Sequence, residues 1–228
     1  MSAIRNIIHT LFPSTCICCG DILVGDESQI CLSCLAHLPH TYFSQQPDNP
    51  AEMMLAGRIP FVSATAMLFY SHGNATQTIV HDMKFHGNSD LCVMMGTMLG
   101  IELLSSGRFD DVDLLLPVPL HWTRRISRGY NQSLLLCQGV QKNFHREISI
   151  GCLYRHRPTR KQSLQHQSQR ASNVYGAFRV KNQTLLSGKH VLLIDDVMTT
   201  GATLTSCCDA LRTVPDIKIS IAVLSMVQ

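Results

Sequence analysis

The sequence predicts an α/β protein in which a mainly parallel sheet is flanked by helices, preceded by a small cysteine-rich module. Two observations lead to this prediction. Largely apolar runs at residues 112–116 and 191–194 are each followed by a polar loop and a helical pattern, as in parallel sheets. Two CxxC pairs lie near the amino end, outside that repeat. The 228 residues suffice for one ordinary domain and one small module.

The composition is that of a globular chain, with 45% hydrophobic and 15% charged residues. No apolar run reaches the length of a membrane span, so we expect no transmembrane segment. Residues 1–12 carry a short amphipathic pattern without the apolar core of a signal peptide, which predicts a cytoplasmic protein. In that compartment the ten cysteines favour metal ligands and buried thiols over disulfides.

Positive charge is concentrated in one part of the chain. Residues 121–181 contain 12 of the 19 Lys and Arg residues and a single acid, Glu147. The net charge of +3 therefore conceals a strongly basic segment, whose partner we expect to be an anion.

Residues 1–45 form the predicted amino-terminal module. Its CxxC pairs are Cys16 with Cys19 and Cys31 with Cys34, separated by eleven residues. Two CxxC turns can direct four thiolates to one zinc ion, and such a closed tetrahedral site has no open position for catalysis. We expect a structural, zinc-ribbon-like site.

Other interpretations of these cysteines remain open. Gly20 relieves the crowded end of a metal knuckle, which favours Cys19 over Cys18 as the ligand, although Cys18 could replace one partner. The thiols could instead be buried without a metal or form a redox pair, although no βαβ unit surrounds the first CxxC.

Residues 46–228 are predicted to form the main domain. Residues 41–59, rich in Gln, Asn and Pro, are typical of a linker. The elements expected from there onward are a short helix at 51–56, a strand at 61–70, and helices at 75–85 and 91–104. The methionines of the last helix lie on one apolar face, which indicates packing and not a metal or cofactor site.

A second strand, loop and helix are expected at residues 112–119, 121–131 and 132–140. The loop holds three arginines and ends in Arg128-Gly129-Tyr130-Asn131. A solvated basic turn is the ordinary interpretation, but a position directly before a helix also suits a phosphate or diphosphate. Residues 153–178 are basic and irregular, which predicts a flexible flap.

The last unit carries two adjacent acids. A buried strand at 191–196 ends in Asp195 and Asp196, and a helix at 204–212 and a strand at 218–225 come later. The loop between them is Thr199-Thr200-Gly201-Ala202-Thr203. The helix terminus favours a phosphate by up to about 2 kcal/mol. We expect a phosphate there, with hydroxyls or a metal ion beside the acids.

Residues 191–203 resemble, at every position, the 13-residue signature of type I phosphoribosyltransferases, which bind 5-phosphoribosyl 1-diphosphate. The chain as a whole resembles the ComF family, zinc-knuckle proteins with a phosphoribosyltransferase-like domain that are linked to DNA uptake in competent bacteria. This resemblance spans about residues 13–205. Its blocks are the CxxC pairs, Met83 to Gly87, Leu116 to Leu120, Arg128 to Gln132, Gln162 with Arg170 and Asn173, and the signature.

The resemblance implies a type I phosphoribosyltransferase fold and a role for each site residue. Asp195 and Asp196 would hold the ribose hydroxyls, directly or through Mg²⁺, and the loop Thr199–Thr203 would wrap the 5-phosphate. Arg128 and Gly129 would lie in the diphosphate loop. Arg128 and Mg²⁺ would neutralise the departing diphosphate if transfer occurs.

The resemblance also implies an accessory factor for single-stranded DNA in natural transformation that retains this pocket. The basic region would follow the DNA phosphates, and Trp122, Tyr130 and Tyr175 would stack on bases. A competence helicase-like protein is the implied partner. Residues 153–178 would take the place of the mobile catalytic flap.

Two other functions compete with this one. The first is an active phosphoribosyltransferase on an unidentified acceptor of the nucleotide-salvage type, and the second is a regulatory sensor of the diphosphate sugar. An acceptor hood would be built from residues 61–90, which contain no obvious base-recognition group. His86, His121 and His156 are candidate general bases, but ordinary surface histidines are expected in such loops.

Overall fold

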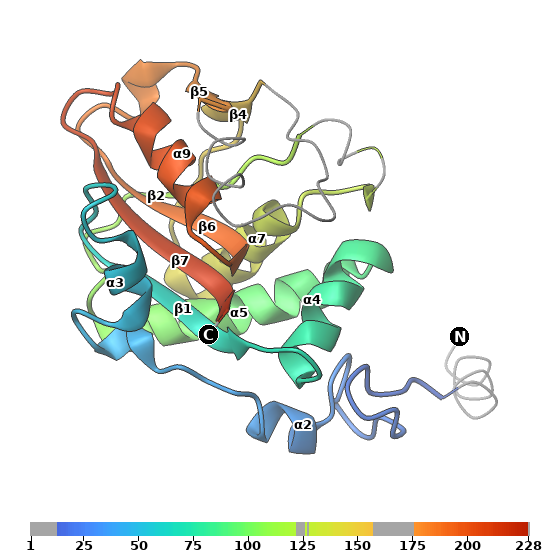
Figure 1. Ribbon diagram of the computed structural model, residues 1–228. Helices are drawn as coiled ribbons and strands as arrows, with labels where there is room; N and C mark the ends of the chain where they lie inside the picture. The colour runs from blue at the N-terminus through green and yellow to red at the C-terminus, as the bar shows by residue number, and fades with distance from the viewer. Residues whose placement is uncertain (1–12, 122–125, 127, 157–175, 228) are drawn as a thin grey trace.

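The computed structural model describes residues 13–121, 126, 128–156 and 176–227 (Figure 1). The described helices are α2 (Leu32–Ala36), α3 (Pro50–Leu55), α4 (Ala75–Phe85), α5 (Ser89–Ser106), α7 (Gln132–Phe144) and α9 (Ala202–Leu211), with 3-10 turns at Phe43–Gln45 and Gln183–Leu185. The strands are β1 (Ala64–Tyr70), β2 (Leu114–Pro117), β3 (Glu147–Ile148), β4 (Leu153–Arg155), β5 (Phe178–Val180), β6 (His190–Met198) and β7 (Lys218–Val227).

Five parallel strands form the main sheet in the order β1-β7-β6-β2-β3. The chain passes from β6 through α9 to β7 on one side, and from β2 through α7 to β3 on the other. The loops after β2 and β6 therefore leave the same edge in opposite directions. Such a switch point opens a crevice outside the strand ends, where ligands bind in open α/β sheets.

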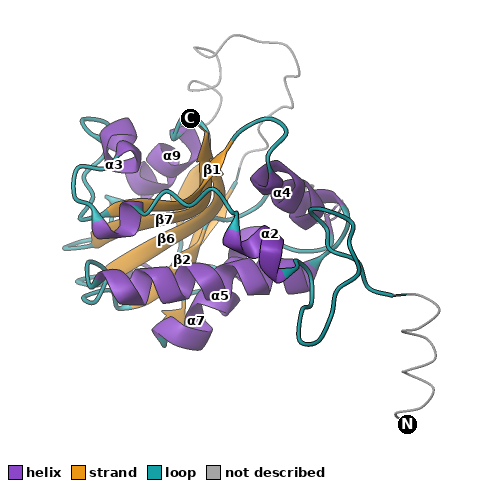
Figure 2. Ribbon diagram, turned by 90° about the horizontal axis from the view of Figure 1, so that it is seen from below, coloured by secondary structure: helices purple, strands orange, loops and turns teal. Residues whose placement is uncertain are grey.

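Two apolar layers cover the sheet, because successive side chains of a strand point to opposite faces. Leu192 and Ile194 join the cluster that includes α4, α5 and α7, whereas Val191 and Leu193 join the cluster of α3 and α9. Figure 2 shows α5 and α7 on one side of the sheet and α3 and α9 on the other. The apolar run before Asp195 is thus fully buried and fixes the position of the carboxylates.

Helices α5 and α7 approach each other backbone to backbone. A Cβ on Gly139 would lie 2.2 Å from the carbonyl oxygen of Val93, and one on Gly96 would lie 2.3 Å from that of Leu136. Only glycine allows so close a contact. The contact fixes α7, and with it the end of the loop that follows β2, against α5.

The amino-terminal module consists of tight turns followed by α2. An antiparallel bridge joins Thr15 to Ile22, and Cys31 is the N-cap of α2. Cys16, Ile30 and Cys31 are buried in the same apolar cluster as residues of α4 and α5. The module is therefore packed against the main domain.

The structure corrects the interpretation of residues 41–59 as a linker. The amide of Thr41 donates to the carbonyl of Met67 at 3.0 Å, and that of Phe69 donates to Pro39 at 2.8 Å, so the chain runs along the outer edge of β1. Asn49, one of the polar residues that suggested a linker, is the N-cap of α3, and its side chain accepts hydrogen bonds from the amides of Ala51 and Glu52.

The helices expected at 75–85 and 91–104 are confirmed, the second with two more residues at each end. The segment 153–178, expected to be irregular, begins and ends in the antiparallel hairpin of β4 and β5. The rest of that flap, residues 157–175, lies outside the described residues, as do the proposed stacking residues Trp122 and Tyr175. Within the described ranges, no helix is long and apolar enough to cross a bilayer.

Candidate functional site

Asp195 and Asp196 lie in the second half of β6, beside β2 at the crevice. Asp195 is only 9% exposed, and its Oδ1 accepts hydrogen bonds from the Ser133 hydroxyl at 3.0 Å and the Asp196 amide at 2.9 Å. Burial and the charge of Asp196 raise the pKa of Asp195 to about 7. A cation beside the pair would favour the ionised form, so the two acids are suited to bind positive charge.

Lys84 supplies a cation to this site that the sequence analysis did not assign. It lies in the last turn of α4, and its Nζ is 3.0 Å from Oδ2 of Asp196. Both side chains are largely buried, at 20% and 15% exposure, so the ion pair is less screened than one on the surface. The only sequence signal was the position of Lys84 in the Met83–Gly87 block.

The loop Thr199–Thr203 connects β6 to α9. Gly201 is the N-cap residue of α9 and has a φ of +72°, in the left-handed region that favours glycine. Thr203 lines the same pocket as Asp195. Because the first amides of a helix have no partner within it, this end of α9 favours an anion.

The loop after β2 brings Arg128 to the crevice. Its guanidinium donates to the side-chain oxygen of Gln132 at 3.1 Å and lies over the ring of Phe85, 5.7 Å from the centroid. Gly129 follows with a φ of +81°, and the side chain of Asn131 caps α7. The carboxyl end of this loop is thus fixed to α7 and α4.

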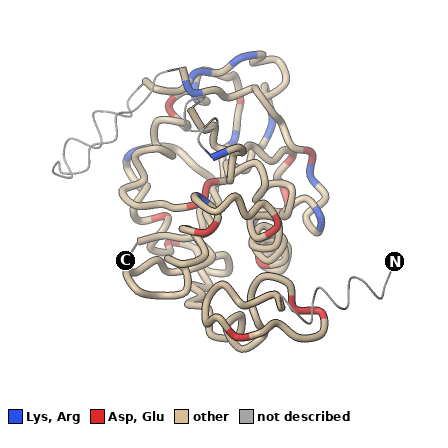
Figure 3. Tube along the Cα trace, turned by 90° about the vertical axis from the view of Figure 1, so that its right-hand side faces the viewer, with Lys and Arg blue, Asp and Glu red and all other residues tan. Residues whose placement is uncertain are grey.

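One pocket unites these groups. Its polar and charged lining residues are the predicted Arg128, Asp195, Asp196 and Thr203, together with Lys84, Asn131, Gln132, Ser133 and Arg155. Within the described residues, the rest of the loop 199–202 does not line it, and Gly129 lines a neighbouring pocket. Figure 3 shows Lys and Arg gathered toward the end of the molecule that carries β4 and β5. Cations from three elements therefore surround two carboxylates, an arrangement suited to a phosphorylated ligand that also bears hydroxyls or a metal.

The predicted ligand thiols of the amino-terminal module converge. The Sγ atoms of Cys16, Cys19, Cys31 and Cys34 all lie within 4.8 Å of one another, and those of Cys19 and Cys31 are 3.8 Å apart. A tetrahedron of Zn–S bonds of about 2.3 Å requires sulfur separations of about 3.8 Å, so the four thiols fit a zinc ion. Cys18 is not a member of this group.

The turn around Cys16 prepares its thiol for a metal. Burial raises the pKa of Cys16, but hydrogen bonds from backbone amides, first that of Cys31, outweigh burial and lower the pKa to about 6. Gly20 has a φ of +82°, and its amide donates to the carbonyl of Cys16 at 2.8 Å. This is the tight knuckle that the sequence predicted at Gly20.

The three candidate histidines do not meet at the pocket. His86 is exposed, with its Nδ1 2.6 Å from Oδ1 of Asp82, whereas His121 is buried, contrary to the expected surface position. His156 follows β4. All three are described, and none of them lines the pocket that contains Asp195.

The family comparison agrees with this geometry. Residues 99–225, which include the loops after β2 and β6, match the family described as the phosphoribosyl transferase domain. The match covers more than half of the chain, and the chain belongs to this family. The fold predicted from the signature is therefore confirmed. Among solved structures, a glutamine phosphoribosylpyrophosphate amidotransferase from B. subtilis is similar over 62% of this chain and 30% of its own, with 17% identity and a TM-score of 0.40.

Two curated relatives are similar to part of this chain. The chain is 31% identical over 136 residues to the DNA utilization protein YhgH of Escherichia coli O157:H7, over 58% of this chain and 59% of that protein. It is 33% identical over 103 residues to competence protein F of Haemophilus influenzae, over 44% of each chain. The chain thus spans less than two thirds of the length of either relative. With the family match, these relatives confirm the ComF resemblance drawn from the sequence blocks.

Proposed function

We propose that the pocket binds 5-phosphoribosyl 1-diphosphate, or a related sugar phosphate, with Mg²⁺. The protein is proposed to be a cytoplasmic accessory factor for single-stranded DNA in natural transformation. The observation that supports the pocket assignment most strongly is the convergence of Lys84, Arg128 and Arg155 on Asp195 and Asp196. The relatives named for DNA utilization and competence support the role with DNA.

Each part of the pocket has a task in this proposal. Asp195 and Asp196 hold the ribose hydroxyls or Mg²⁺, and the loop Thr199–Thr203 receives the 5-phosphate through its backbone amides. Arg128 and Gly129 face the diphosphate. Bound Mg²⁺ would neutralise part of the diphosphate charge. The four cysteines of the amino-terminal module hold a structural zinc ion.

A calorimetric titration with 5-phosphoribosyl 1-diphosphate tests the pocket. Binding is expected only with Mg²⁺, and it should disappear when Asp195→Asn and Asp196→Asn are combined. Asp209→Asn on α9 is the matched control, because this acid lies near the other end of the helix, beside Arg212. No binding by the natural protein at millimolar ligand would refute the pocket assignment.

Single-stranded DNA added as a competitor tests the second half of the proposal. Competition is expected if DNA phosphates use the same cations, Arg128 and Arg155 among them. DNA binding without competition would separate the two ligands and remove the shared groove. A helicase-like partner is also proposed, and co-purification with a competence helicase would test it.

An active phosphoribosyltransferase is the second candidate, because the pocket keeps both carboxylates and the arginine of the diphosphate loop. Residues 61–90, proposed as an acceptor hood, include β1, an edge strand of the main sheet. Release of diphosphate in the presence of one of a panel of nucleobases would support this candidate. Binding without release with every nucleobase would support a sensor instead.

A further inference from the structure

A contact from a distant part of the chain reaches the loop Thr199–Thr203. Nη1 of Arg58 donates a hydrogen bond of 2.7 Å to the carbonyl oxygen of Thr200. Arg58 follows the short helix α3 and is separated from Thr200 by 142 positions. The same end of α3 therefore meets the phosphate side of the proposed pocket.

A second contact lies at the next residue of the loop. A Cβ on Gly201 would lie 3.0 Å from Cδ2 of Leu55, which is fully buried at the end of α3. Gly201 also has a φ of +72°. Any larger residue at 201 would need both a strained backbone and a displaced Leu55. The loop thus lies directly against α3.

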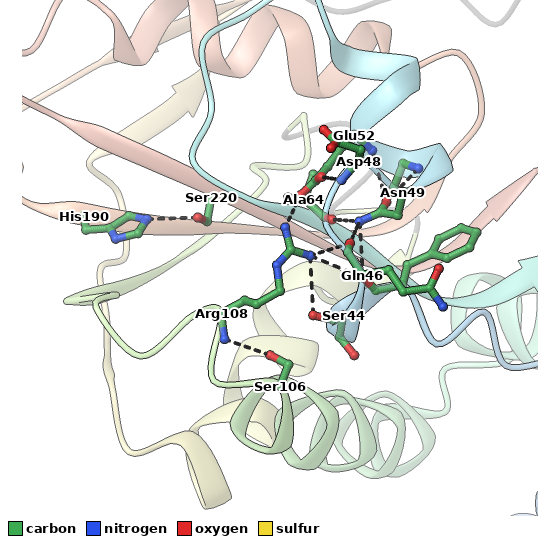
Figure 4. Close-up of polar contacts among 12 residues, drawn as sticks. Ser44, Gln46, Asp48, Asn49, Glu52, Ala64, Ser106, Arg108, His190 and Ser220 are labelled. Atoms are coloured by element: carbon green, nitrogen blue, oxygen red, sulfur yellow. Dashed lines mark hydrogen bonds and ion pairs between the residues drawn. The ribbon is translucent and has the colours of Figure 1, made fainter.

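Buried polar groups hold α3 in place (Figure 4). Glu52 is 7% exposed, and its Oε1 is 2.6 Å from Nη2 of Arg108 and accepts the amide of Ala64 at 3.0 Å. Asn49 is the N-cap residue. Its side-chain amide donates hydrogen bonds to the carbonyl oxygens of Phe43, Gln46 and Ala64, and its side-chain oxygen accepts from the amides of Ala51 and Glu52. Burial of the pair costs hydration of both ions, and separating them would leave an unpaired buried charge. The pair therefore holds the six-residue helix α3 in one position.

We infer that α3 and Arg58 brace the loop Thr199–Thr203, and that Arg58 is a positioning residue for the 5-phosphate. This inference rests on the proposed function of the loop. The peptide between Thr200 and Gly201 is planar, with its N–H directed opposite to its C=O. Holding the carbonyl of Thr200 therefore sets the direction of the Gly201 amide. An amide that already points in the required direction loses little conformational freedom when the anion binds, and this strengthens binding.

The test compares ligands that do and do not use this loop. Arg58→Met keeps the length of the side chain and removes the donor, and ribose 5-phosphate is expected to bind about tenfold more weakly. Inorganic diphosphate with Mg²⁺ should bind as before, because its proposed contacts are in the loop after β2. Arg58→Lys, which retains a donor, should restore part of the affinity. Arg212→Met, an exposed arginine just beyond the other end of α9, is the matched control.

Amide hydrogen exchange of residues 199–203 without ligand gives a readout independent of binding. Faster exchange in Arg58→Met, with unchanged exchange in α5, is expected from a brace. Unchanged exchange and unchanged ribose 5-phosphate affinity would overturn the inference. Equal weakening of both ligands would also overturn it, because it would indicate a general charge effect. If the natural protein binds no ribose 5-phosphate, the proposed function of the loop fails, while the exchange result still decides whether a brace exists.

Discussion

At the scale of single residues, the buried acids of the pocket lower the stability of the folded chain. Asp195 is a carboxylate buried beside a second one, and its hydrogen bonds to Ser133 and the Asp196 amide only partly offset the cost. Active and binding sites commonly hold such perturbed groups, because a ligand later supplies the missing charge. The acids should therefore weaken the free protein.

Replacing Asp195 by Asn should stabilise the ligand-free protein, because Asn keeps an oxygen for both hydrogen bonds and carries no charge. An unfolded Asp has a pKa of about 3.9, and the folded pKa of Asp195 is about 7. As the pH rises through this window, the unfolded chain releases the proton first, and the natural protein loses stability. At pH 8 the gain should be at least about 1 kcal/mol, or about 2–4 °C in Tm.

The control for this prediction is the pH itself. At pH 4 the difference in Tm between the natural protein and Asp195→Asn should be much smaller than at pH 8, because Asp195 is then protonated in the folded state and about half protonated in the unfolded chain. A difference that is constant from pH 4 to pH 8 would contradict the assignment of the gain to this charge.

Lys84 should influence the protonation of Asp195. Its positive charge lowers the pKa of Asp195 against the larger effects of burial and Asp196. Lys84→Met is therefore expected to raise the pKa of Asp195 above its present value of about 7, as measured by carboxyl carbon chemical shifts in an NMR titration. Lys218→Met, an exposed lysine at the start of β7, should leave the titration unchanged.

At the scale of elements, the glycine contact between α5 and α7 leaves no room for a larger side chain. Gly139→Ala would place a methyl group 2.2 Å from the carbonyl oxygen of Val93, and backbone cannot move aside as a side chain can. We expect a loss of at least about 2 kcal/mol in the free energy of unfolding, measured with urea. Leu104→Ala, on an exposed position of α5, should cost at most about 0.5 kcal/mol. Equal losses would show that the close contact is not responsible.

The amino-terminal module should depend on its metal. Cys19→Ser is expected to abolish stoichiometric zinc and to lower Tm by more than about 4 °C, because Cys16 and Cys31 belong to the core cluster that reaches α4. Cys18→Ser is the paired control and should retain one zinc ion per chain. Loss of zinc in Cys18→Ser, measured by atomic absorption, would instead make Cys18 a ligand.

The sequence predicted elements well where the pattern is local. The helix at 75–85 was placed at its observed bounds, because Asn74 caps it and its apolar spacing is regular. The sequence did not predict the two-residue strand β3, because so short a strand has no periodic pattern of apolar residues. The short helix expected at 51–56 is confirmed as α3, but the linker assignment of residues 41–59 was wrong, because caps and buried ion pairs have the same polar composition as a linker.

The site was predictable only in part, for the same reason. Asp195, Asp196 and Thr203 stand in one continuous block, and the structure places all three in one pocket. Lys84 and Arg58 reach the site from other elements, through contacts that only the folded chain creates. No spacing in the sequence connects Arg58 to Thr200.

At the scale of the whole molecule, positive charge is unevenly distributed. Residues 13–45 contain three acids and no Lys or Arg, whereas most basic residues lie between 121 and 181. Figure 3 shows Asp and Glu spread over the molecule, and Lys and Arg mainly in its upper part. A polyanion should therefore bind at the end that carries β4 and β5, away from the cysteine module.

Binding of single-stranded DNA should depend strongly on salt. The slope of log K against log salt is expected to be about −0.7 for each phosphate neutralised. Charge reversal at Arg155, Arg157 and Arg160 should weaken binding and make the slope less steep. Arg157 and Arg160 lie outside the described residues. Fluorescence anisotropy with a labelled oligonucleotide measures both, and Lys218→Glu, an exposed lysine at the start of β7, is the control. Affinity that is the same at low and moderate salt would refute a phosphate track.

The path of residues 39–41 has a consequence for how the chain can be divided. β1 ends the sheet, and an open edge strand is a template on which another chain can add a strand. His40 pairs with Leu68 and the amide of Thr41 with Met67, so the protein covers this edge with its own chain. A protein shortened to residues 46–228 would expose it to other copies. Its aggregation would report the loss of this cover together with the loss of the cysteine module, which packs in the same apolar cluster as α4 and α5.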